Sequence, residues 1–409
     1  MGDGFYFDPA DRAIDWGAGD SLILVNPEWR RREPESFDAA RRRLPTLDGH
    51  VWISTSGASR DRPGRIRWVA LSKAALLASA AAVNAHLGAT AVDVWAHALP
   101  MFHVGGVGIL ARARLAGSRV VPAIAARWDA RHFHLQAGDT RATLSALVPS
   151  QIHDLVEAGL AAPPSMRAIV VGGARLDADL YRRARALGWP CLPSYGLTET
   201  CSQVATASLA TLSSTEVPTV LPVLGHAEMR ANEAQRLSIR GTSLLTCYAE
   251  LDGDDVRAWD PKQDAWLETE DLGRVDALGV EVFGRTSESV KVLGEVVSLP
   301  RVEEHARRWA AGEALFAGMA LDLAVVALPH PRAGHELVLV LSSDGRDRLE
   351  PLTTGRLWPS FDQFEQEALL PFERIQRVVW VDRIPRTPLG KCRRALLARE
   401  VGLQAGPDL

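Results

Sequence analysis

Cysteine is scarce in this sequence, and so are the features that mark secreted or membrane-spanning proteins. Only four cysteines occur among 409 residues, too few for a disulfide scaffold. No two of them have the CxxC spacing of a structural zinc site. No apolar run approaches the roughly 18 residues that a membrane span needs. The sequence therefore excludes a small disulfide-rich protein and a membrane protein.

A leader segment and an excess of one charge are missing as well. The first residues, MGDGFYFDPADRAIDW, contain neither a basic region nor an apolar core, so we predict no signal peptide and a cytoplasmic protein. The 46 Lys and Arg residues nearly balance the 50 Asp and Glu residues, which gives a net charge of -4. Nucleic-acid binding needs a basic face, so we do not expect nucleic acid as a partner.

The chain is long enough for two or three domains, and its clearest structural unit lies in the middle. Ala168–Val171 predicts a short strand that ends at two glycines. Asp177 then caps a helix, which Gly188 ends. Pro190–Pro193 begins the next strand, so the pattern predicts two parallel strands with a right-handed crossover. Ligands bind at the carboxyl ends of such strands in open α/β sheets.

The pattern differs on either side of this unit. Before it, we expect strands at 50–54 and 67–71 and a helix capped by Ser72. After about residue 215, alternating strands at 235–240, 255–259 and 279–283 predict antiparallel sheet. Beyond Arg285 we expect helices near 301–311 and 361–369, and strands at 323–328, 337–341 and 377–381. We place a boundary near Arg285–Ser289, giving an N-terminal domain of residues 1–285 and a C-terminal domain of residues 286–409.

Several local features could carry chemistry, and each has a plain structural alternative. The hydroxyl-rich loop 55–59 could cradle phosphate or be an ordinary turn. His103, beside two glycines, could contact a substrate or be structural. Glu199 and Thr198 suit a magnesium–phosphate site, but Thr198 could equally cap a helix whose dipole Glu199 complements. Lys391 lies in a Pro- and Gly-rich loop, where a lysine is usually a solvated charge.

The order of these features makes the sequence recognisable. It resembles the adenylate-forming superfamily of acyl-CoA synthetases, nonribosomal-peptide adenylation domains and luciferases over about residues 51 to 400. The matching motifs are TSG at 55–57, PMFHVGG at 100–106, VGGA at 171–174, YGLTET at 195–200, TEDLG at 269–273, GR with KVLGEVV at 284–297, and PRTPLGK at 385–391. The stretches FHVGGVGILARARLAGSRVV and SYGLTETCSQVATAS look most like 2-succinylbenzoate–CoA ligases of menaquinone biosynthesis.

The resemblance implies an α/β fold. It has a large N-terminal AMP-binding domain of mixed and parallel sheets with an antiparallel subdomain, shortened at its N-terminus, and a small mobile α+β C-terminal domain. It also implies two half-reactions. A carboxylate attacks the α-phosphorus of ATP to give an acyl-adenylate and pyrophosphate, and CoA then displaces AMP to form a thioester. The implied ligands are a small-molecule carboxylate, ATP, Mg2+ and CoA as co-substrate. A homodimer is left open.

The resemblance also assigns roles by motif. Lys391 is expected to bridge the carboxylate and the α-phosphate, Thr198 to touch that phosphate, Glu199 to face the metal ion, and His103 to lie beside the acyl pocket and the thiol tunnel. Ser287 matches the hinge about which the C-terminal domain rotates, so Lys391 would serve only the first half-reaction. The implied nucleotide-binding residues are Thr55, Ser56, Gly57, Gly172, Gly173, Ala174, Tyr195, Gly196, Asp271 and Arg285. The implied substrate-binding residues are His103, Gly196, Ser202 and Gln203.

The sequence departs from the superfamily pattern mainly at the phosphate loop. It has Ala58 and Arg60 where the pattern has a hydroxyl residue and a glycine, and it lacks the Pro-Lys pair. Arg65 or Arg67 could supply the missing charge, although an arginine does not simply replace a lysine. We therefore keep three alternatives to a 2-succinylbenzoate ligase open. These are a CoA ligase for another aryl or acyl acid, a catalytically weak nucleotide- or acyl-binding homologue, and transfer to a carrier-protein arm.

Overall fold

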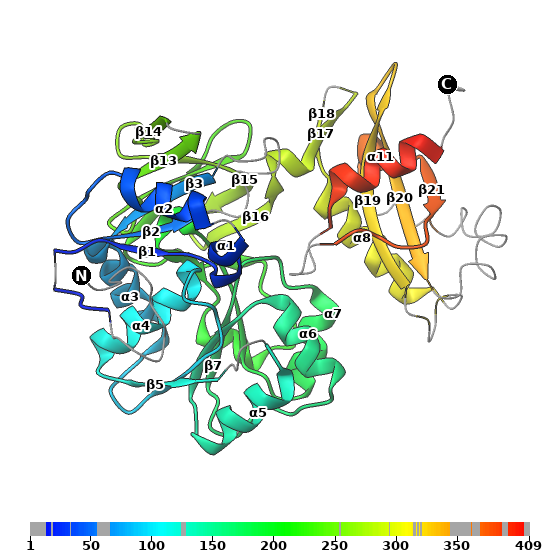
Figure 1. Cartoon of the computed structure of the whole chain (residues 1–409). Helices are drawn as coiled ribbons and strands as arrows, with labels where there is room; N and C mark the ends of the chain where they lie inside the picture. The colour runs from blue at the N-terminus through cyan, green and yellow to red at the C-terminus, as the bar shows by residue number, and fades with distance from the viewer. Residues whose placement is uncertain are drawn as a thin grey trace. The chain divides into compact units, whose positions relative to one another are not determined.

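The computed structural model describes residues 14–17, 19–32, 34–54, 66–123, 128–252, 255–293, 295–313, 316, 319, 321–343, 361, 369–386 and 392–404 (Figure 1). The chain divides into two compact units. The first comprises Met1–Asn232, Leu237–Thr269 and Val275–Glu281, and the second Glu233–Arg236, Glu270–Arg274 and Val282–Leu409. The domain boundary between residues 285 and 286 stays a prediction.

The central sheet of the first unit has six strands in the order β5-β4-β6-β7-β8-β9. The first five strands run parallel and β9 runs antiparallel to β8. The predicted parallel pair is confirmed, because Val171 of β7 lies opposite Pro193 of β8. The strands are β4 (Val94–His97), β5 (Arg119–Pro122), β6 (Leu144–Leu147), β7 (Ala168–Val171), β8 (Cys191–Leu197) and β9 (Ser202–Thr206).

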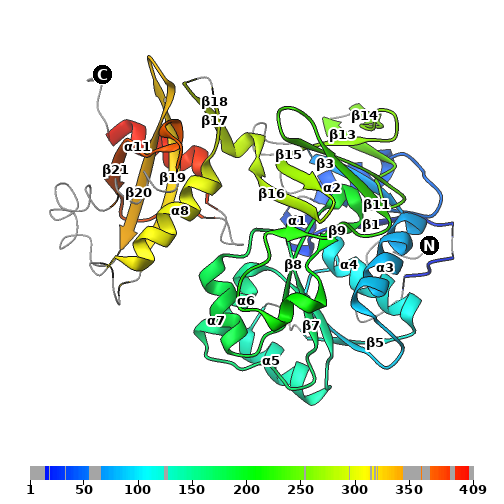
Figure 2. The same cartoon turned by 180° about the vertical axis from the view of Figure 1, so that it is seen from behind.

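Helices cover both faces of this sheet, as Figures 1 and 2 show from opposite sides. One face carries α3 (Lys73–Leu87) and α4 (Val104–Ala116), and the other α5 (Ala130–Asp139), α6 (Pro149–Glu157) and α7 (Ala178–Ala186). The helix ends follow the predicted signals. Ser72 caps α3, Asp177 caps α7, and Gly188 follows α7 with a φ of 82°.

Two further five-stranded sheets have the orders β1-β2-β3-β13-β14 and β10-β16-β15-β12-β11. The antiparallel pairing predicted after residue 215 is confirmed for β11 with β12 and for β13 with β14. Two helices, α1 (Pro27–Arg32) and α2 (Pro34–Arg43), follow β1. The strands are β1 (Leu22–Leu24), β2 (His50–Ser54), β3 (Ile66–Ser72), β10 (Val220–Leu221), β11 (Ala227–Ala231), β12 (Arg236–Gly241), β13 (Cys247–Asp252), β14 (Asp255–Trp259), β15 (Leu267–Asp276) and β16 (Gly279–Arg285).

The second unit contains a three-stranded sheet, β19-β20-β21, between two helices. Successive side chains of a strand point to opposite faces, so Leu323 and Val325 of β19 pack with α8 while Ala324 and Val326 pack with α11. A hairpin, β17 (Ser289–Val292) and β18 (Glu295–Ser298), precedes this sheet. The elements are α8 (Leu299–Gly312), β19 (Leu321–His330), β20 (Gly334–Ser343), β21 (Arg377–Trp380) and α11 (Arg394–Gln404).

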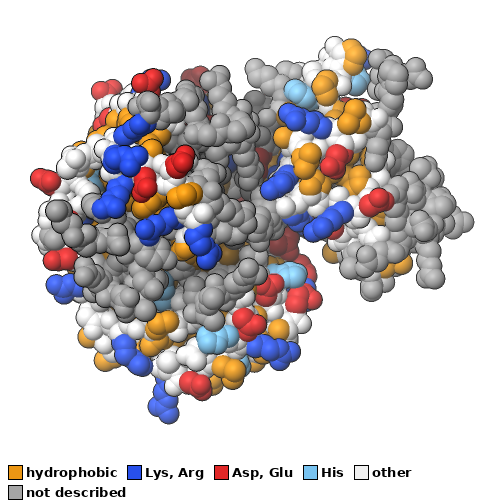
Figure 3. Space-filling model, viewed as in Figure 1, with side chains coloured by type: hydrophobic (Ala, Val, Ile, Leu, Met, Phe, Trp, Pro, Cys, Tyr) orange, Lys and Arg blue, Asp and Glu red, His pale blue; other side chains and the backbone are white. Residues whose placement is uncertain are grey.

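The structure extends one predicted strand and leaves one predicted helix largely undescribed. The strand predicted to begin at Pro190–Pro193 starts at Cys191 and continues through Leu197, so Tyr195 and Gly196 belong to β8. Most of the helix predicted near Phe361–Leu369 lies outside the described residues. No helix among the described residues is long and apolar enough to cross a membrane. Both signs of charge occur on the face shown in Figure 3, as the near-neutral net charge implies.

Candidate active site

The turn after β7 leaves backbone open at the carboxyl edge of the central sheet. Gly173 has a φ of 82°, a left-handed conformation that favours glycine. A Cβ at Gly172 would lie 2.8 Å from the Ser194 Oγ, which itself donates to the Val171 carbonyl. Gly173 and Ala174 are exposed. A ligand can therefore approach the backbone closely at this turn, as the prediction requires.

The antiparallel ribbon of β8 and β9 carries four of the predicted site residues, Tyr195, Gly196, Ser202 and Gln203. Its register shifts between Tyr195 and Gly196. A Cβ at Gly196 would lie 2.0 Å from the Ser202 carbonyl oxygen, so only glycine fits there. Cys201 and Ser202 have φ angles of 56° and 112°, which are rare for residues other than glycine. Strained backbone of this kind is typical of functional sites.

The turn between these strands presents Thr198 and Glu199. Residues Thr198–Thr200 form one turn of 3-10 helix with Leu197 at the N-cap position. The Thr200 Oγ1 accepts from the Leu197 amide at 3.0 Å and donates to the Ser202 carbonyl at 2.7 Å. The alternative in which Thr198 caps a helix is therefore wrong. Thr200 closes the turn, and this leaves the Thr198 and Glu199 side chains half-buried at its outer side.

Glu199 is held from the neighbouring sheet. The Tyr248 hydroxyl donates to the Glu199 Oε1 at 2.9 Å, and the Leu245 amide donates to the Glu199 carbonyl at 2.7 Å. Among the described residues no three His, Cys, Asp or Glu side chains group as metal ligands. Magnesium is often held by one or two carboxylates together with substrate phosphates and water. A single oriented carboxylate at Glu199 fits that mode of binding.

Arg67 does not carry the unpaired charge that the altered phosphate loop would need. Its guanidinium pairs with Glu250 at 2.7 Å and lies 5.2 Å from the centre of the Tyr248 ring. The paired carboxylate neutralises it, so the structure opposes the role proposed for Arg67 at the phosphates. Thr55, Ser56, Gly57 and Arg65 lie outside the described residues.

His103 lies immediately before α4. It occupies the N-cap position without a capping side-chain hydrogen bond. Its ring is exposed and stands 4.6 Å from the ring of Phe102. Surrounding protein atoms disfavour the charged imidazole and lower the pKa of His103. Position 106 needs a glycine, because a Cβ there would lie 2.3 Å from the Pro100 carbonyl oxygen. His103 thus presents an exposed ring at the N-terminus of α4.

Arg112 is a candidate site residue that no sequence motif indicated. Its Nη2 donates to the Ser202 Oγ at 3.0 Å and to the Gln203 Oε1 at 2.6 Å. Arg112 is only 1% exposed, and burial lowers the pKa of its guanidinium to about 10. In the part of the chain that the structure describes, no carboxylate pairs with it, and its Nε and Nη1 have no hydrogen-bond partner. The sequence signal was an arginine inside the apolar stretch GILARARLA.

The second unit brings together the predicted ribose ligand and its companion. The Arg285 Nε at the end of β16 donates to the Asp271 Oδ1 of β15 at 2.8 Å. Asp271 is 4% exposed, whereas about half of the Arg285 side chain is open. Buried carboxylates need such partners, and the second oxygen of an anchored carboxylate can accept from hydroxyl groups. Asp271 and Arg285 are thus in direct contact, and their role at a nucleotide stays a prediction.

The predicted hinge and adenylation lysine lie elsewhere in this unit. Ser287 belongs to one turn of 3-10 helix, Thr286–Glu288, between β16 and β17. Lys391 lies outside the described residues, but both flanks of its loop are defined. Arg386 and Cys392 form an antiparallel bridge, and the Arg393 amide donates to the Pro385 carbonyl at 2.8 Å. The ends of the loop are thus fixed side by side.

Comparisons with known proteins agree with this geometry. Residues 64–241 match the family of AMP-binding enzymes. A 2-succinylbenzoate–CoA ligase of Bacillus licheniformis is 28% identical over 265 residues, 63% of this chain and 54% of that relative. One of Enterococcus faecalis is 26% identical over 330 residues, 77% of this chain and 63% of the relative. The chain thus spans about half to two thirds of the curated relatives it matches.

Solved structures share the fold. The o-succinylbenzoate CoA synthetase (MenE) of Bacillus subtilis, in complex with AMP, matches with a TM-score of 0.70 and 22% identity over 94% of this chain and 79% of that one. The same enzyme in complex with ATP and magnesium ion matches with a TM-score of 0.69 and 21% identity, over 92% of this chain and 79% of that one. These structures show that the chain shares their fold, and residues 64–241 match the AMP-binding enzyme family within it.

Proposed function

We propose that this protein is an ATP-dependent carboxylate–CoA ligase that works through an acyl-adenylate, and that its acid is 2-succinylbenzoate. The reaction places it in menaquinone biosynthesis. The match of residues 64–241 to the AMP-binding enzyme family and the shared fold support the reaction class. The retained pattern of Thr198, Glu199, Asp271, Arg285 and Lys391 supports catalysis rather than decay. The names of the matched relatives support the choice of acid.

The observation that carries the choice of acid is the buried guanidinium of Arg112. Burying a charge without a counter-ion costs several kcal/mol, so a protein keeps one where a ligand supplies the partner. Arg112 meets Ser202 and Gln203, the two predicted substrate-binding residues on β9. The acid 2-succinylbenzoate has two carboxylates. One would be activated and the other would pair with Arg112.

The reaction proceeds by two displacements. An oxygen of the acid attacks the α-phosphorus of ATP, the bond to the β-phosphate breaks, and pyrophosphate leaves. The CoA thiolate then attacks the carbonyl carbon, and AMP leaves with the oxygen that came from the acid. Both reactants of the first step are anions, so their repulsion must be offset by fixed positive charge and by positioning.

The roles of this chain's own residues follow from that requirement. Lys391 would neutralise the acid and the α-phosphate, and Thr198 would donate to that phosphate. Asp271, held by Arg285, would accept from the ribose hydroxyls. Glu199, oriented by Tyr248, would hold magnesium, which neutralises phosphate charge when bound. The ring of His103 would line the path to the carbonyl carbon.

Pyrophosphate release from MgATP with a panel of acids, with and without CoA, tests the proposal. The expected result is release with 2-succinylbenzoate alone, and a CoA thioester once CoA is added. Benzoate, 2-carboxybenzoate and a medium-chain fatty acid serve as comparison acids. Release with another acid only would keep the reaction class and discard the substrate.

A second candidate, a weak nucleotide- or acyl-binding homologue, is favoured by the phosphate loop. The loop lacks the usual Pro-Lys pair, and Arg67 is committed to Glu250. Losing one preorganised phosphate contact costs ~10²–10³-fold in rate. Exchange between ATP and labelled pyrophosphate separates the two, because a binder gives no exchange with any acid while it still binds ATP.

A further inference from the structure

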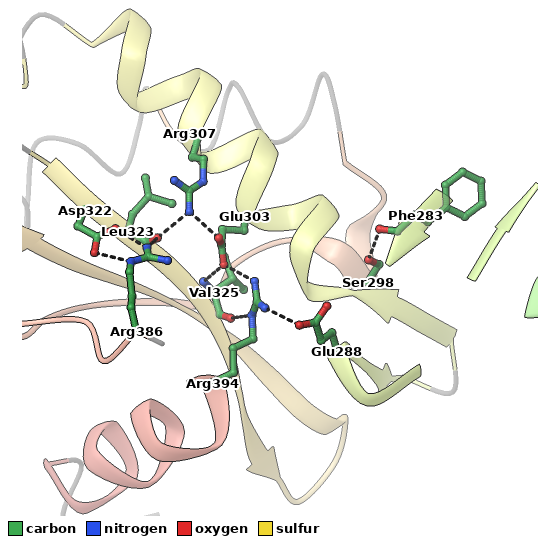
Figure 4. A network of polar contacts seen from close by, with 10 residues as sticks. All are labelled: Phe283, Glu288, Ser298, Glu303, Arg307, Asp322, Leu323, Val325, Arg386 and Arg394. Carbon is green, nitrogen blue, oxygen red and sulfur yellow. Dashed lines mark hydrogen bonds and ion pairs between the residues drawn. The ribbon is translucent and has the colours of Figure 1, made fainter. Parts of the chain in front are cut away.

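The second unit contains a buried acidic residue that joins three elements. Glu303 of α8 is 7% exposed. Its carboxylate accepts from the Arg307 Nη2 at 2.6 Å, from the Arg394 Nη2 at 2.5 Å and from the Val325 amide at 3.1 Å (Figure 4). Burial alone would raise the pKa of Glu303, but the two guanidinium groups outweigh it and hold that pKa below its usual range. Glu303 is therefore a satisfied anionic anchor.

Arg394 also contacts two residues other than Glu303, namely Val325 and Glu288. It is the first residue of α11, and its side chain is 16% exposed. Its Nε donates to the Val325 carbonyl at 3.2 Å, and its Nη1 donates to the Glu288 carboxylate at 3.3 Å (Figure 4). One guanidinium thus links α8, β19 and the 3-10 turn Thr286–Glu288. The three contacts use different nitrogens, a geometry that a lysine cannot reproduce.

Arg394 lies close in the sequence to Lys391, so this network holds one flank of the Lys391 loop. It lies three residues after Lys391. The other flank of the same loop is held by Arg386, which forms a two-pronged ion pair with Asp322 of β19 and also donates to the Leu323 carbonyl (Figure 4). Both flanks of the loop are therefore bound to the β19 strand and its neighbours.

The predicted hinge lies between two anchored residues. Arg285, before it, is bound to Asp271 at 2.8 Å. Glu288, after it, is bound to Arg394. The Ser289 Oγ closes the turn by donating to the Arg285 carbonyl at 2.9 Å. Because Glu288 is tied to α11, a rotation at Ser287 would carry Glu288, Arg394 and both flanks of the lysine loop as one piece.

We propose that Glu288 and Arg394 are positioning residues for the adenylation half-reaction, because their ion pair locks the chain after the hinge to the flank of the Lys391 loop. This inference rests on the proposed function. Without the ion pair, the loop flank and the hinge segment lose their direct link, so the lysine reaches its reactive position in a smaller fraction of molecules. Thioester formation, which does not use Lys391, depends less on that coupling.

Glu288→Gln tests this with little risk to folding, because it keeps the shape and removes only the charge. Glu336→Gln is the matched control, since Glu336 pairs with Arg377 at 2.8 Å in the same unit and is also largely buried. We expect Glu288→Gln to slow pyrophosphate release roughly 5- to 10-fold, as loss of about 1 kcal/mol or slightly more predicts. Thioester formation from supplied acyl-adenylate should change less than 2-fold. The control should change neither.

Equal loss of both half-reactions, or no loss in either, overturns the positioning role while the proposed function stands. Hydrogen–deuterium exchange of the peptide 385–397 gives a readout that needs no catalysis. We expect faster exchange in Glu288→Gln than in Glu336→Gln, even if the wild-type protein activates none of the acids. Unchanged exchange in Glu288→Gln would refute the coupling itself.

Discussion

Replacing Arg112 with methionine is the perturbation that bears most directly on the choice of acid. Methionine keeps a long side chain and removes the charge and all five donors. It would break the contacts with Ser202 and Gln203, although these two side chains still bond to each other at 3.1 Å. The variant therefore removes one cation and leaves the hydrogen bond between Ser202 and Gln203 in place.

The magnitude follows from the burial of this side chain. A hydrogen bond to a charged group contributes about 1.5–3 kcal/mol, which is roughly 10- to 150-fold in kcat/KM. An acid with a second carboxylate should lose that amount in Arg112→Met. An acid with one carboxylate leaves the guanidinium unpaired, so its kcat/KM should change less than about 3-fold. Removing an unpaired buried charge in favour of an apolar side chain is often neutral or stabilising, so the melting temperature should not fall.

Pyrophosphate release with 2-succinylbenzoate and with a 2-acylbenzoate that lacks the second carboxylate provides the assay. The ratio of the two kcat/KM values cancels general damage to the site. Arg112→Lys is the companion variant, since it keeps charge but loses the planar fork, and should fall between the wild type and Arg112→Met. An equal loss with both acids would show that Arg112 is structural and does not bind the second carboxylate.

Three further predictions concern other residues. Tyr248→Phe removes the donor to Glu199 and should raise the magnesium concentration for half-maximal activity roughly 3- to 10-fold without changing the melting temperature, as a magnesium titration would show. Asp271→Asn should raise the KM for ATP about 10-fold or more while the KM for the acid stays constant. The Asp93 pKa of about 2 is lower than its usual 3.8; burial opposes this shift, and hydrogen bonds from Arg167, Thr90 and Thr143 outweigh it. That stabilisation is present above pH ~4 and is lost as the pH falls toward 2. Asp93→Asn should abolish this roughly 2 kcal/mol pH dependence in urea unfolding.

The local elements were predictable because their signals are local. The apolar β-branched run of Ala168–Val171 and the caps at Ser72 and Asp177 depend on residues a few positions apart. The alternation after residue 215 likewise gave antiparallel strands. The turn at Thr198 was ambiguous, because a threonine before a glutamate suits a cap as well as a ligand site. In the structure the Thr200 hydroxyl closes this turn through contacts with Leu197 and Ser202, so Thr198 is not the cap.

Contacts between site residues from distant parts of the chain were harder to predict from the sequence. Arg112 meets Ser202 and Gln203 only because α4 packs against β9, about ninety positions later in the sequence. Nothing in the stretch GILARARLA says whether its arginines are buried. Arg67 looked available for phosphate until the pairing of β3 with β13 placed Glu250 opposite it. The motifs carry a resemblance to a superfamily, whereas the partners of each side chain depend on tertiary packing.

The central claim is that the acid is activated as an adenylate, and an isotope measurement tests it directly. The acid is labelled with ¹⁸O in the carboxylate to be activated and is turned over with MgATP and CoA. Because AMP leaves with the oxygen from the acid, the account predicts one ¹⁸O atom in the AMP, detected by mass spectrometry, and none in the pyrophosphate. Label in inorganic phosphate together with ADP, or thioester formation with unlabelled AMP, would contradict it.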